Sequence, residues 1–239
     1  MNRLAVLSLH TSPLVQPGSG DSGGMNVYVR ELISAFARLG RESTVFVRRT
    51  DLTTPEIVDV EPGFRVVHVT AGALNLSKEE LPEVVDQFAD QVAKWIRKHG
   101  GLDGLLANYW LSGLAGHRLK HELDLPLTTV FHTLARVKAE TGDIEPQRRM
   151  DAETTVARCS DIILANSEEE AHQLVDLYGA DISRIEIVPP GVDHSLFSPG
   201  DQQEARNAIG LNGDPVLLFV GRIQPLKGVE LAIKTLADL

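Results

Sequence analysis

The sequence predicts an α/β protein built on a doubly wound parallel sheet. Short apolar runs such as residues 4–9 recur along the first 188 residues, and each has the length of a buried strand. Between them lie segments whose apolar residues follow helical spacing, of which residues 81–96 are the longest. Strands that alternate with helices in this way are typical of a parallel sheet covered on both faces.

Length and composition narrow the class of protein. The 239 residues suffice for one large domain, or for one domain and part of a second. A formal net charge of −10 argues against binding to nucleic acid or to anionic membranes, so local cations would have to hold any phosphate ligand. The single cysteine, Cys159, excludes an internal disulfide, and we expect a buried structural thiol in a reducing compartment.

No targeting or membrane segment is expected. A positive charge precedes the first apolar run, but that run is shorter than the ~7–15 residues of a signal sequence. No stretch approaches the ~20 apolar residues of a membrane span. We therefore expect a cytoplasmic protein.

The expected elements follow in chain order. Strands are expected at residues 4–9, 43–48, 64–70, 102–108, 126–132, 161–166 and 185–188. Helices are expected from the glycine cluster to residue 39, and at about 77–99, 111–123, 148–156 and 168–178. The loop at 50–63 should be exposed, and the segment at 138–146 is polar.

Two capping boxes, Ser77 with Glu80 and Ser167 with Glu170, are expected to open helices. The first would place Lys78 in the first helical turn, where the helix dipole disfavours a cation unless an anion lies nearby.

We expect three parts: a first domain at 1–188, a linker at 189–212 and the start of a second domain at 213–239. The last part contains an expected strand at 215–222 and a helix from Lys227 onward. One strand and one helix cannot bury their own apolar faces, so the chain is expected to be truncated within the second domain.

A glycine cluster at residues 18–24 is the main candidate site. Its backbone can approach a ligand closely, and the helix that follows adds unpaired N–H groups and a favourable dipole, so we expect an anion site. A flexible surface loop is the alternative. Residues 18–23 also match a dinucleotide fingerprint, and Arg48 and Arg49 would suit NADP, but two prolines separate the fingerprint from its strand.

Polar and aromatic residues follow several strands, and in parallel sheets such ends meet at one edge, where ligands bind. They are His10, Asn108, Tyr109, Trp110, His132, Thr133, Asn166 and Ser167. Arg148 and Arg149 are either a phosphate clamp or a solvated basic pair. Arg222 and Lys227, at another strand-to-helix junction, indicate a second anion site, with a glycine turn and surface charges as the alternative.

His117 and His121 are four residues apart, as zinc ligands can be. The His-Glu-x-x-His motif is absent and the sequence reveals no third ligand, so we expect a solvated helix face and no metal site.

Five segments together resemble one family: residues 20–29, 108–113, 131–135, 189–193 and 221–228. They are similar to the family-4 retaining glycosyltransferases, whose GT-B fold has two Rossmann-like domains. The resemblance implies transfer of a sugar, N-acetylglucosamine, from a UDP-sugar to a phosphorylated polyol such as 1D-myo-inositol 3-phosphate, as in mycothiol biosynthesis. Enzymes that make sucrose phosphate share several of these motifs and remain an alternative.

The resemblance also assigns roles to residues. Those assigned to the donor and its diphosphate are His10, Gly23, Gly24, His132, Arg222 and Lys227, of which His132, Arg222 and Lys227 are expected to be catalytic. Those assigned to the acceptor and its phosphate are Asn26, Lys78, Tyr109, Thr133 and Arg149. It implies no cofactor and no strictly required metal, and it leaves a homodimer open.

Two departures from the family pattern stand out. Asn108 takes the place of the usual histidine, which affects local hydrogen bonding. The family's Glu-x7-Glu motif, which contacts the donor, is expected beyond Leu239. We therefore expect the chain alone to be inactive in transfer, and a non-catalytic sugar-phosphate-binding protein is the second hypothesis.

Overall fold

The computed structural model describes residues 2–16, 23–140, 142–211, 213–221, 223 and 227–237. The chain divides into two compact units, Met1–Pro190 (unit 1) and Gly191–Leu239 (unit 2). Among the described residues, no helix combines the length and the apolar character needed to cross a membrane.

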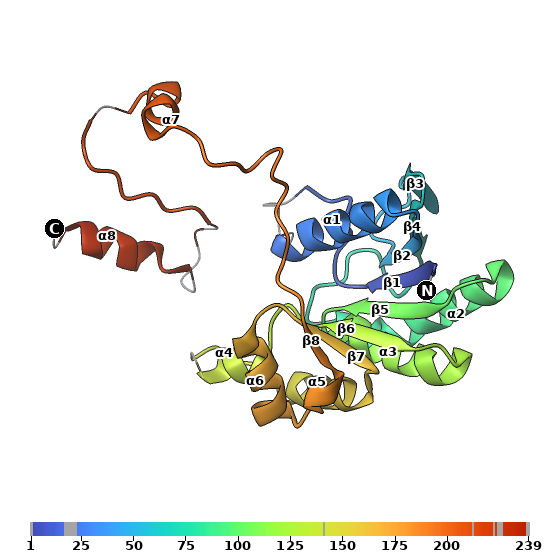
Figure 1. Ribbon diagram of the computed structural model, residues 1–239. Helices are drawn as coiled ribbons and strands as arrows, with labels where there is room; N and C mark the ends of the chain where they lie inside the picture. Colours follow the sequence, from blue (N-terminus) through green and yellow to red (C-terminus); the bar gives the residue numbers. More distant parts are fainter. Residues whose placement is uncertain are drawn as a thin grey trace. The chain divides into compact units, whose positions relative to one another are not determined.

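Unit 1 is built on one eight-stranded sheet with the order β3-β4-β2-β1-β5-β6-β7-β8 (Figure 1). The strands are β1 (Arg3–Ser8), β2 (Glu42–Arg48), β3 (Ile57–Glu61), β4 (Phe64–Val69), β5 (Gly104–Asn108), β6 (Leu127–Val130), β7 (Ile162–Ala165) and β8 (Ile185–Ile187). Every neighbouring pair is parallel except β3 with β4. The predicted parallel α/β sheet is confirmed.

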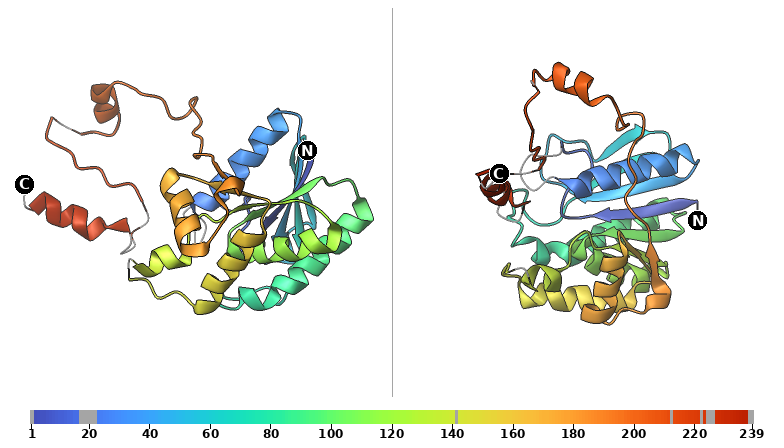
Figure 2. Two further views of the ribbon diagram at one scale, coloured as in Figure 1. Left: turned by 60° about the horizontal axis from the view of Figure 1, so that its bottom comes forward. Right: turned by 60° about the vertical axis from the view of Figure 1, so that its left-hand side comes forward.

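Helices cover both faces of this sheet. They are α1 (Gly24–Arg38), α2 (Val85–His99), α3 (Trp110–Leu123), α4 (Ala135–Glu140), α5 (Gln147–Cys159) and α6 (Glu168–Tyr178), with short 3-10 turns η1 (Leu81–Val84) and η2 (Ile182–Arg184). Helix α1 packs on the face that carries Val6 and Val45. Helices α2 and α3 pack on the face that carries Leu7 and Phe46, opposite α1 (Figure 2).

Burial on both faces explains the apolar runs in the sequence. Ala5, Val6 and Leu7 are consecutive in the central strand β1, and all three are fully buried. Alternate residues of a strand point to opposite faces, so a strand with helices on both sides needs an apolar residue at every position.

In unit 1, one strand and one α-helix lie where the sequence indicated none. Strand β3 occupies part of the expected loop at 50–63 and pairs antiparallel with β4 at the edge of the sheet. The acidic residues of β3 gave this segment the pattern of an exposed loop. An edge strand can carry such residues because one of its faces can remain in water. Helix α4 begins before the polar segment at 138–146, and its short length gave little periodicity.

The expectation for residues 77–80 is wrong in part. The N–H of Ser77 donates to the Glu80 carboxylate at 2.8 Å, but η1 follows and α2 begins only at Val85. Pro82 lacks an N–H, and it disfavours helical geometry in the residue before it. Lys78 therefore does not lie in the first turn of a helix, and the dipole argument for a nearby anion fails. The second capping serine is confirmed, since Ser167 Oγ accepts from the Glu170 N–H at 3.1 Å.

Unit 2 contains α7 (Gln202–Ala208) and α8 (Val229–Ala237). The expected strand at 215–222 is not formed, because residues 215–220 belong to no strand and Arg222 lies outside the described residues. A strand requires a hydrogen-bonded neighbour, and the described part of unit 2 contains no other strand.

Candidate functional site

Residues that follow β1, β5 and β6 meet at the carboxyl edge of the sheet. His10 lies just beyond β1 and Tyr109 just beyond β5, and their ring centres are 5.2 Å apart. Helix α5 contributes Arg149, whose guanidinium carbon lies 5.1 Å from the centre of the Tyr109 ring. Arg149 Nη2 also donates to the Thr133 carbonyl at 3.1 Å and to its hydroxyl at 3.0 Å. The structure thus brings four of the predicted residues into one cluster.

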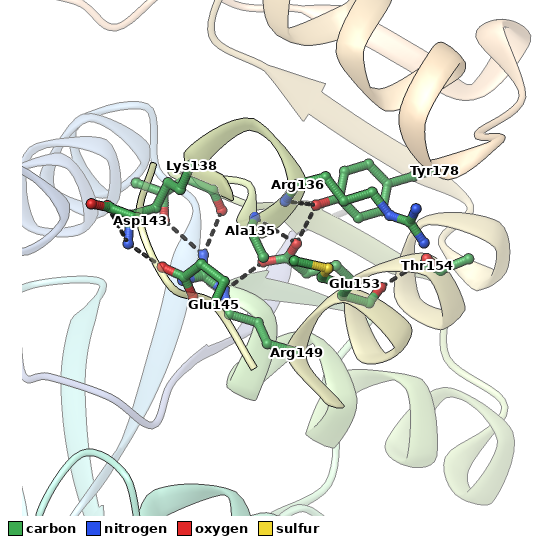
Figure 3. A network of polar contacts seen from close by, with 11 residues as sticks. Ala135, Arg136, Lys138, Asp143, Glu145, Arg149, Glu153, Thr154 and Tyr178 are labelled. Carbon is green, nitrogen blue, oxygen red and sulfur yellow. Dashed lines mark hydrogen bonds and ion pairs between the residues drawn. The ribbon is translucent and has the colours of Figure 1, made fainter. Parts of the chain in front are cut away.

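Two carboxylates balance the charge of Arg149. Its Nε donates to Glu153 at 2.8 Å and its Nη1 to Glu145 at 2.9 Å (Figure 3). Arg149 is 5% exposed and Glu153 is fully buried. Burial alone would lower the pKa of Arg149. Its interactions with Tyr109, Glu153 and Glu145 have the larger effect, so the pKa of Arg149 is raised above its ordinary value. Arg149 is therefore a fixed cation with most of its donors in use.

The partners of Arg149 are held in turn by neighbouring groups. Glu153 accepts from the Tyr178 hydroxyl at 2.6 Å and from the Ala135 N–H at 2.9 Å (Figure 3). Burial and this bond to Glu153 raise the pKa of Tyr178. Lys138 pairs with Glu145 and, at 3.2 Å, with Asp143. The sequence did not reveal this network, although the spacing of four residues places Arg149 and Glu153 on one face of α5, with Glu145 just before the helix.

His132 also lies at the carboxyl edge of the sheet, just beyond β6. Its Nε2 is 3.0 Å from Asn108 Oδ1, and the Tyr28 ring meets its ring edge-on at 5.0 Å between centres. Burial lowers the pKa of His132 to about 4, so the imidazole is neutral at neutral pH. Asn108 is fully buried, and its Nδ2 has no hydrogen-bond partner among the described residues. Tyr28 is a contact that the sequence reasoning did not name.

The backbone is strained at two of these positions. Tyr109 has φ 75° and His132 has φ 64°, in a region that residues other than glycine rarely adopt. Among the described residues, the other non-glycine case is Asp124, at the end of α3. Each such conformation costs about 1–3 kcal/mol and persists where the surroundings enforce it, often at functional sites.

The start of α1 faces the loop after β1. Asn26 is buried, and its Nδ2 donates to Thr11 Oγ1 at 2.8 Å and to the Ser12 carbonyl at 2.6 Å. Its Oδ1 accepts from the Gly23 N–H at 3.4 Å. A Cβ built on Gly24 would meet no atom within 4 Å, so packing within the described protein does not require glycine there. The rest of the predicted glycine cluster, including Gly18 and Gly20, lies outside the described residues.

Lys78 lies in a segment that is held against α5. Arg148 donates to the Glu79 carbonyl at 2.8 Å and pairs with Glu83 at 3.1 Å. Arg148 is exposed and secures this segment. Lys78 itself is exposed and forms no ion pair within the described part of the chain.

The residues near the end of the chain that are predicted to bind the UDP-sugar donor belong to unit 2. Lys227 is exposed and lies just before α8. Arg222 lies outside the described residues. The structure therefore brings His10, Tyr109, Thr133 and Arg149 together and leaves the role of Arg222 and Lys227 a prediction.

A cavity of about 680 Å³ lies at the opposite edge of the sheet, where the strands begin. Arg3, Glu42, Phe64 and Trp95 are among its lining residues. Ligands of open α/β sheets bind at the carboxyl ends of the strands, so this cavity is not the candidate site.

Known proteins resemble this chain in sequence. The sequence profile described as Glycosyltransferase Family 4 matches residues 22–196. A D-inositol 3-phosphate glycosyltransferase of Xylanimonas cellulosilytica is 46% identical over 251 residues, which cover 99% of this chain and 60% of that protein. The protein of the same name from Kribbella flavida is 46% identical, with 100% and 58% covered. The chain thus spans about 60% of the length of these curated relatives.

Solved structures resemble it in fold. Sucrose-phosphate synthase from Thermosynechococcus elongatus matches with a TM-score of 0.90 and 28% identity, covering 100% of this chain and 60% of that one. Anabaena Alr3699/HepE, solved in complex with UDP-glucose, matches with a TM-score of 0.65 at 17% identity, covering 99% and 57%. These are GT-B structures, so the predicted fold class is confirmed. With its profile match across most of unit 1, the chain belongs to Glycosyltransferase Family 4.

Proposed function

We propose that this chain is the acceptor-binding part of a retaining glycosyltransferase that moves a sugar from a UDP-sugar to a phosphorylated polyol. The specific reaction would be transfer of N-acetylglucosamine to 1D-myo-inositol 3-phosphate, the glycosyl transfer of mycothiol biosynthesis. The names of relatives at 46% identity support the inositol phosphate acceptor. The donor sugar follows from the resemblance alone.

The cluster of Tyr109, Thr133 and Arg149 is the observation that carries this proposal. Helix α5, which carries Arg149, also holds the segment that contains Lys78, through the bond from Arg148 to the Glu79 carbonyl. Arg149 has two carboxylate partners, so it would orient Thr133 and Tyr109 more than add free charge. Lys78 is exposed and has no carboxylate partner in the described structure, so it would supply the positive charge that a phosphate requires. A charge-assisted hydrogen bond of this kind contributes about 1.5–3 kcal/mol. Asn26, held by Thr11 and Ser12, would line the polyol side of the site.

The donor would lie across the start of α1. The N–H groups near Gly23 and Gly24 and the dipole of α1 favour a diphosphate there. The neutral imidazole of His132 would hydrogen-bond to the donor sugar without adding charge, and His10 would line the same pocket.

Charge on the departing UDP would be neutralised by Arg222 and Lys227. Stabilisation of developing charge is commonly the largest catalytic contribution, and these two cations would provide it without a strictly required metal. The reaction would pass through an oxocarbenium-like state, with the departing phosphate accepting the proton of the acceptor hydroxyl.

A second candidate acceptor is a sugar phosphate. It is supported by the TM-score of 0.90 to a sucrose-phosphate synthase, which covers the whole chain at 28% identity. Both candidate acceptors, inositol phosphate and sugar phosphate, would place a phosphate beside Lys78 and Thr133. They differ in the ring that carries the phosphate, so only contacts with that ring can distinguish them.

The test is an assay of the full product of this gene with UDP-N-acetylglucosamine and three acceptors: inositol 3-phosphate, a hexose phosphate and free inositol. The proposal expects transfer to inositol 3-phosphate with the anomeric configuration of the donor retained, as measured by proton NMR of the product. Preference for the hexose phosphate would support the second candidate. Transfer to free inositol at the same efficiency, or inversion at the anomeric carbon, would contradict the proposal.

A further inference from the structure

The structure places a third side chain of a metal-ligating type, Cys159, beside His117 and His121. The two imidazoles lie one turn apart on α3, with ring centres 5.0 Å apart. Cys159 is the last residue of α5, and its Sγ lies 3.3 Å from His121 Nε2. Cys159 is half-buried, which corrects the expectation of a buried structural thiol. One ligand atom from each of the three residues lies within 4.8 Å of the other two.

Close packing of α3 and α5 produces this arrangement. A Cβ at Gly113 of α3 would lie 2.8 Å from Val156 Cγ1 of α5, so only glycine permits this approach. Lys120 Nζ then donates to the Cys159 carbonyl at 2.8 Å and to Asp161 at 2.6 Å. The end of α5 is thereby fixed against the histidine-bearing face of α3.

We propose that His117, His121 and Cys159 bind one Zn²⁺ ion. Two imidazoles and a thiolate form a ligand set that zinc prefers, and three protein ligands leave the fourth tetrahedral position to water. Zn–N bonds of about 2.0–2.1 Å and a Zn–S bond of about 2.3 Å place tetrahedral N and S ligands about 3.5 Å apart. The observed distance of 3.3 Å between Nε2 and Sγ is close to that separation.

A second observation concerns the His117 imidazole. His117 Nδ1 is buried and has no hydrogen-bond partner among the described residues. Lys120 is neutralised by Asp161, so it does not leave an unpaired cation beside the ion.

Zinc at this place would join α3 to the end of α5. Helix α5 also carries Arg149, so the ion would stabilise the helix that orients the proposed acceptor site without taking part in transfer. An ion that binds only the folded chain raises the unfolding temperature in proportion to the logarithm of its concentration.

Zinc affinity of the chain should be measured by competition with a chromophoric chelator. The expected result is one tightly bound ion per chain, with affinity lowered about 100-fold or more in Cys159→Ser and in His121→Gln. His172→Gln, which changes an exposed histidine on α6, is the matched control and should leave affinity unchanged. His121 is also exposed, so its variant should fold even where Cys159→Ser does not.

Cobalt provides an independent readout. Co²⁺ bound at this site should show a thiolate-to-metal charge-transfer band that disappears in Cys159→Ser, and Zn²⁺ should raise the unfolding temperature of the unmodified chain only. Affinity that survives both Cys159→Ser and His121→Gln, or a cobalt complex without the thiolate band, would overturn the proposal. The contact between His121 and Cys159 would then be a hydrogen bond between an imidazole and a thiol, without a metal.

Discussion

The guanidinium of Arg149 lies 5.1 Å from the centre of the Tyr109 ring, and Tyr109 is one of two site residues held at positive φ. A cation over an aromatic face contributes about 0.5–2 kcal/mol, more where water is excluded. Arg149 is itself fixed by Glu145 and Glu153. The buried carboxylates therefore keep a strained aromatic residue in place.

Removing the cation should destabilise unit 1. Arg149→Ala leaves the fully buried Glu153 without its ionic partner, which costs about 3–5 kcal/mol. Urea unfolding followed by circular dichroism measures the loss. The matched control is Arg148→Ala, whose ion pair with Glu83 is exposed and is worth about 1 kcal/mol or less. Equal losses in the two variants would contradict the assigned network.

Gly24→Ala should separate ligand binding from stability. A methyl group at Gly24 meets no protein atom within 4 Å, so the free energy of unfolding should stay unchanged or rise by up to about 1 kcal/mol. The same group would crowd a diphosphate at the start of α1, so the donor KM of the full gene product should rise. Gly113→Ala is the contrasting variant and should destabilise by about 1–3 kcal/mol, because the new Cβ meets Val156 at 2.8 Å. An unchanged donor KM in Gly24→Ala would remove Gly24 from the donor site.

His132 should make stability depend on pH. Its pKa is about 4 in the folded chain and about 6.5 in the unfolded chain, so the unfolded chain binds the proton more readily. The contribution of neutral His132 to the free energy of unfolding is complete above about pH 6.5 and is lost as the pH falls to about 4. It amounts to about 3 kcal/mol in total. His132→Asn removes the titrating group, and asparagine tolerates the positive φ. The free energy of unfolding should therefore fall less on acidification in the variant than in the unmodified chain, and identical falls would refute the assignment.

The contact between Asn108 and His132 should control the pKa of the imidazole. Asn108→Asp places a carboxylate where the amide oxygen lies 3.0 Å from Nε2, and a close opposite charge raises a histidine pKa by about 1–3 units. NMR titration of the His132 ring measures the change. Asn108→Ser adds no charge and should leave the pKa low. A pKa that stays near 4 in Asn108→Asp would show that the two side chains do not interact in solution.

The sheet could be predicted from the sequence because the pattern of apolar residues within each segment is enough to identify it. Buried strands are apolar at every position, and the apolar residues of a helix recur along one of its faces. The sequence also placed Tyr109, His132 and Thr133 at one edge, since parallel strands end together. It did not predict that Arg149 is buried between Glu145 and Glu153. Opposite charges four residues apart have the same sequence pattern whether the ion pair is exposed or buried. Only tertiary packing distinguishes a buried pair from an exposed one.

Other differences have equally specific causes. Pro82 delayed the start of α2 despite a capping-box pattern before it. Cys159 is 38 residues from His121 in the chain, so its contact depends on how α3 and α5 pack. Residues 215–220 have the composition of a strand, but strand formation depends on a neighbour that residue pattern alone does not supply.

We propose that a phosphorylated acceptor binds beside Lys78, Thr133 and Arg149. Calorimetric titration of the chain with inositol 3-phosphate and with free inositol tests it most directly, and Lys78→Gln and Lys94→Gln serve as the test and control variants. Lys94 is an exposed lysine on α2, so its replacement changes the net charge equally. We expect the phosphate to bind at least about tenfold more tightly than free inositol, with about 10–100-fold loss in Lys78→Gln and none in Lys94→Gln. Equal affinity for the two ligands, or equal effects of the two lysine variants, would contradict the account.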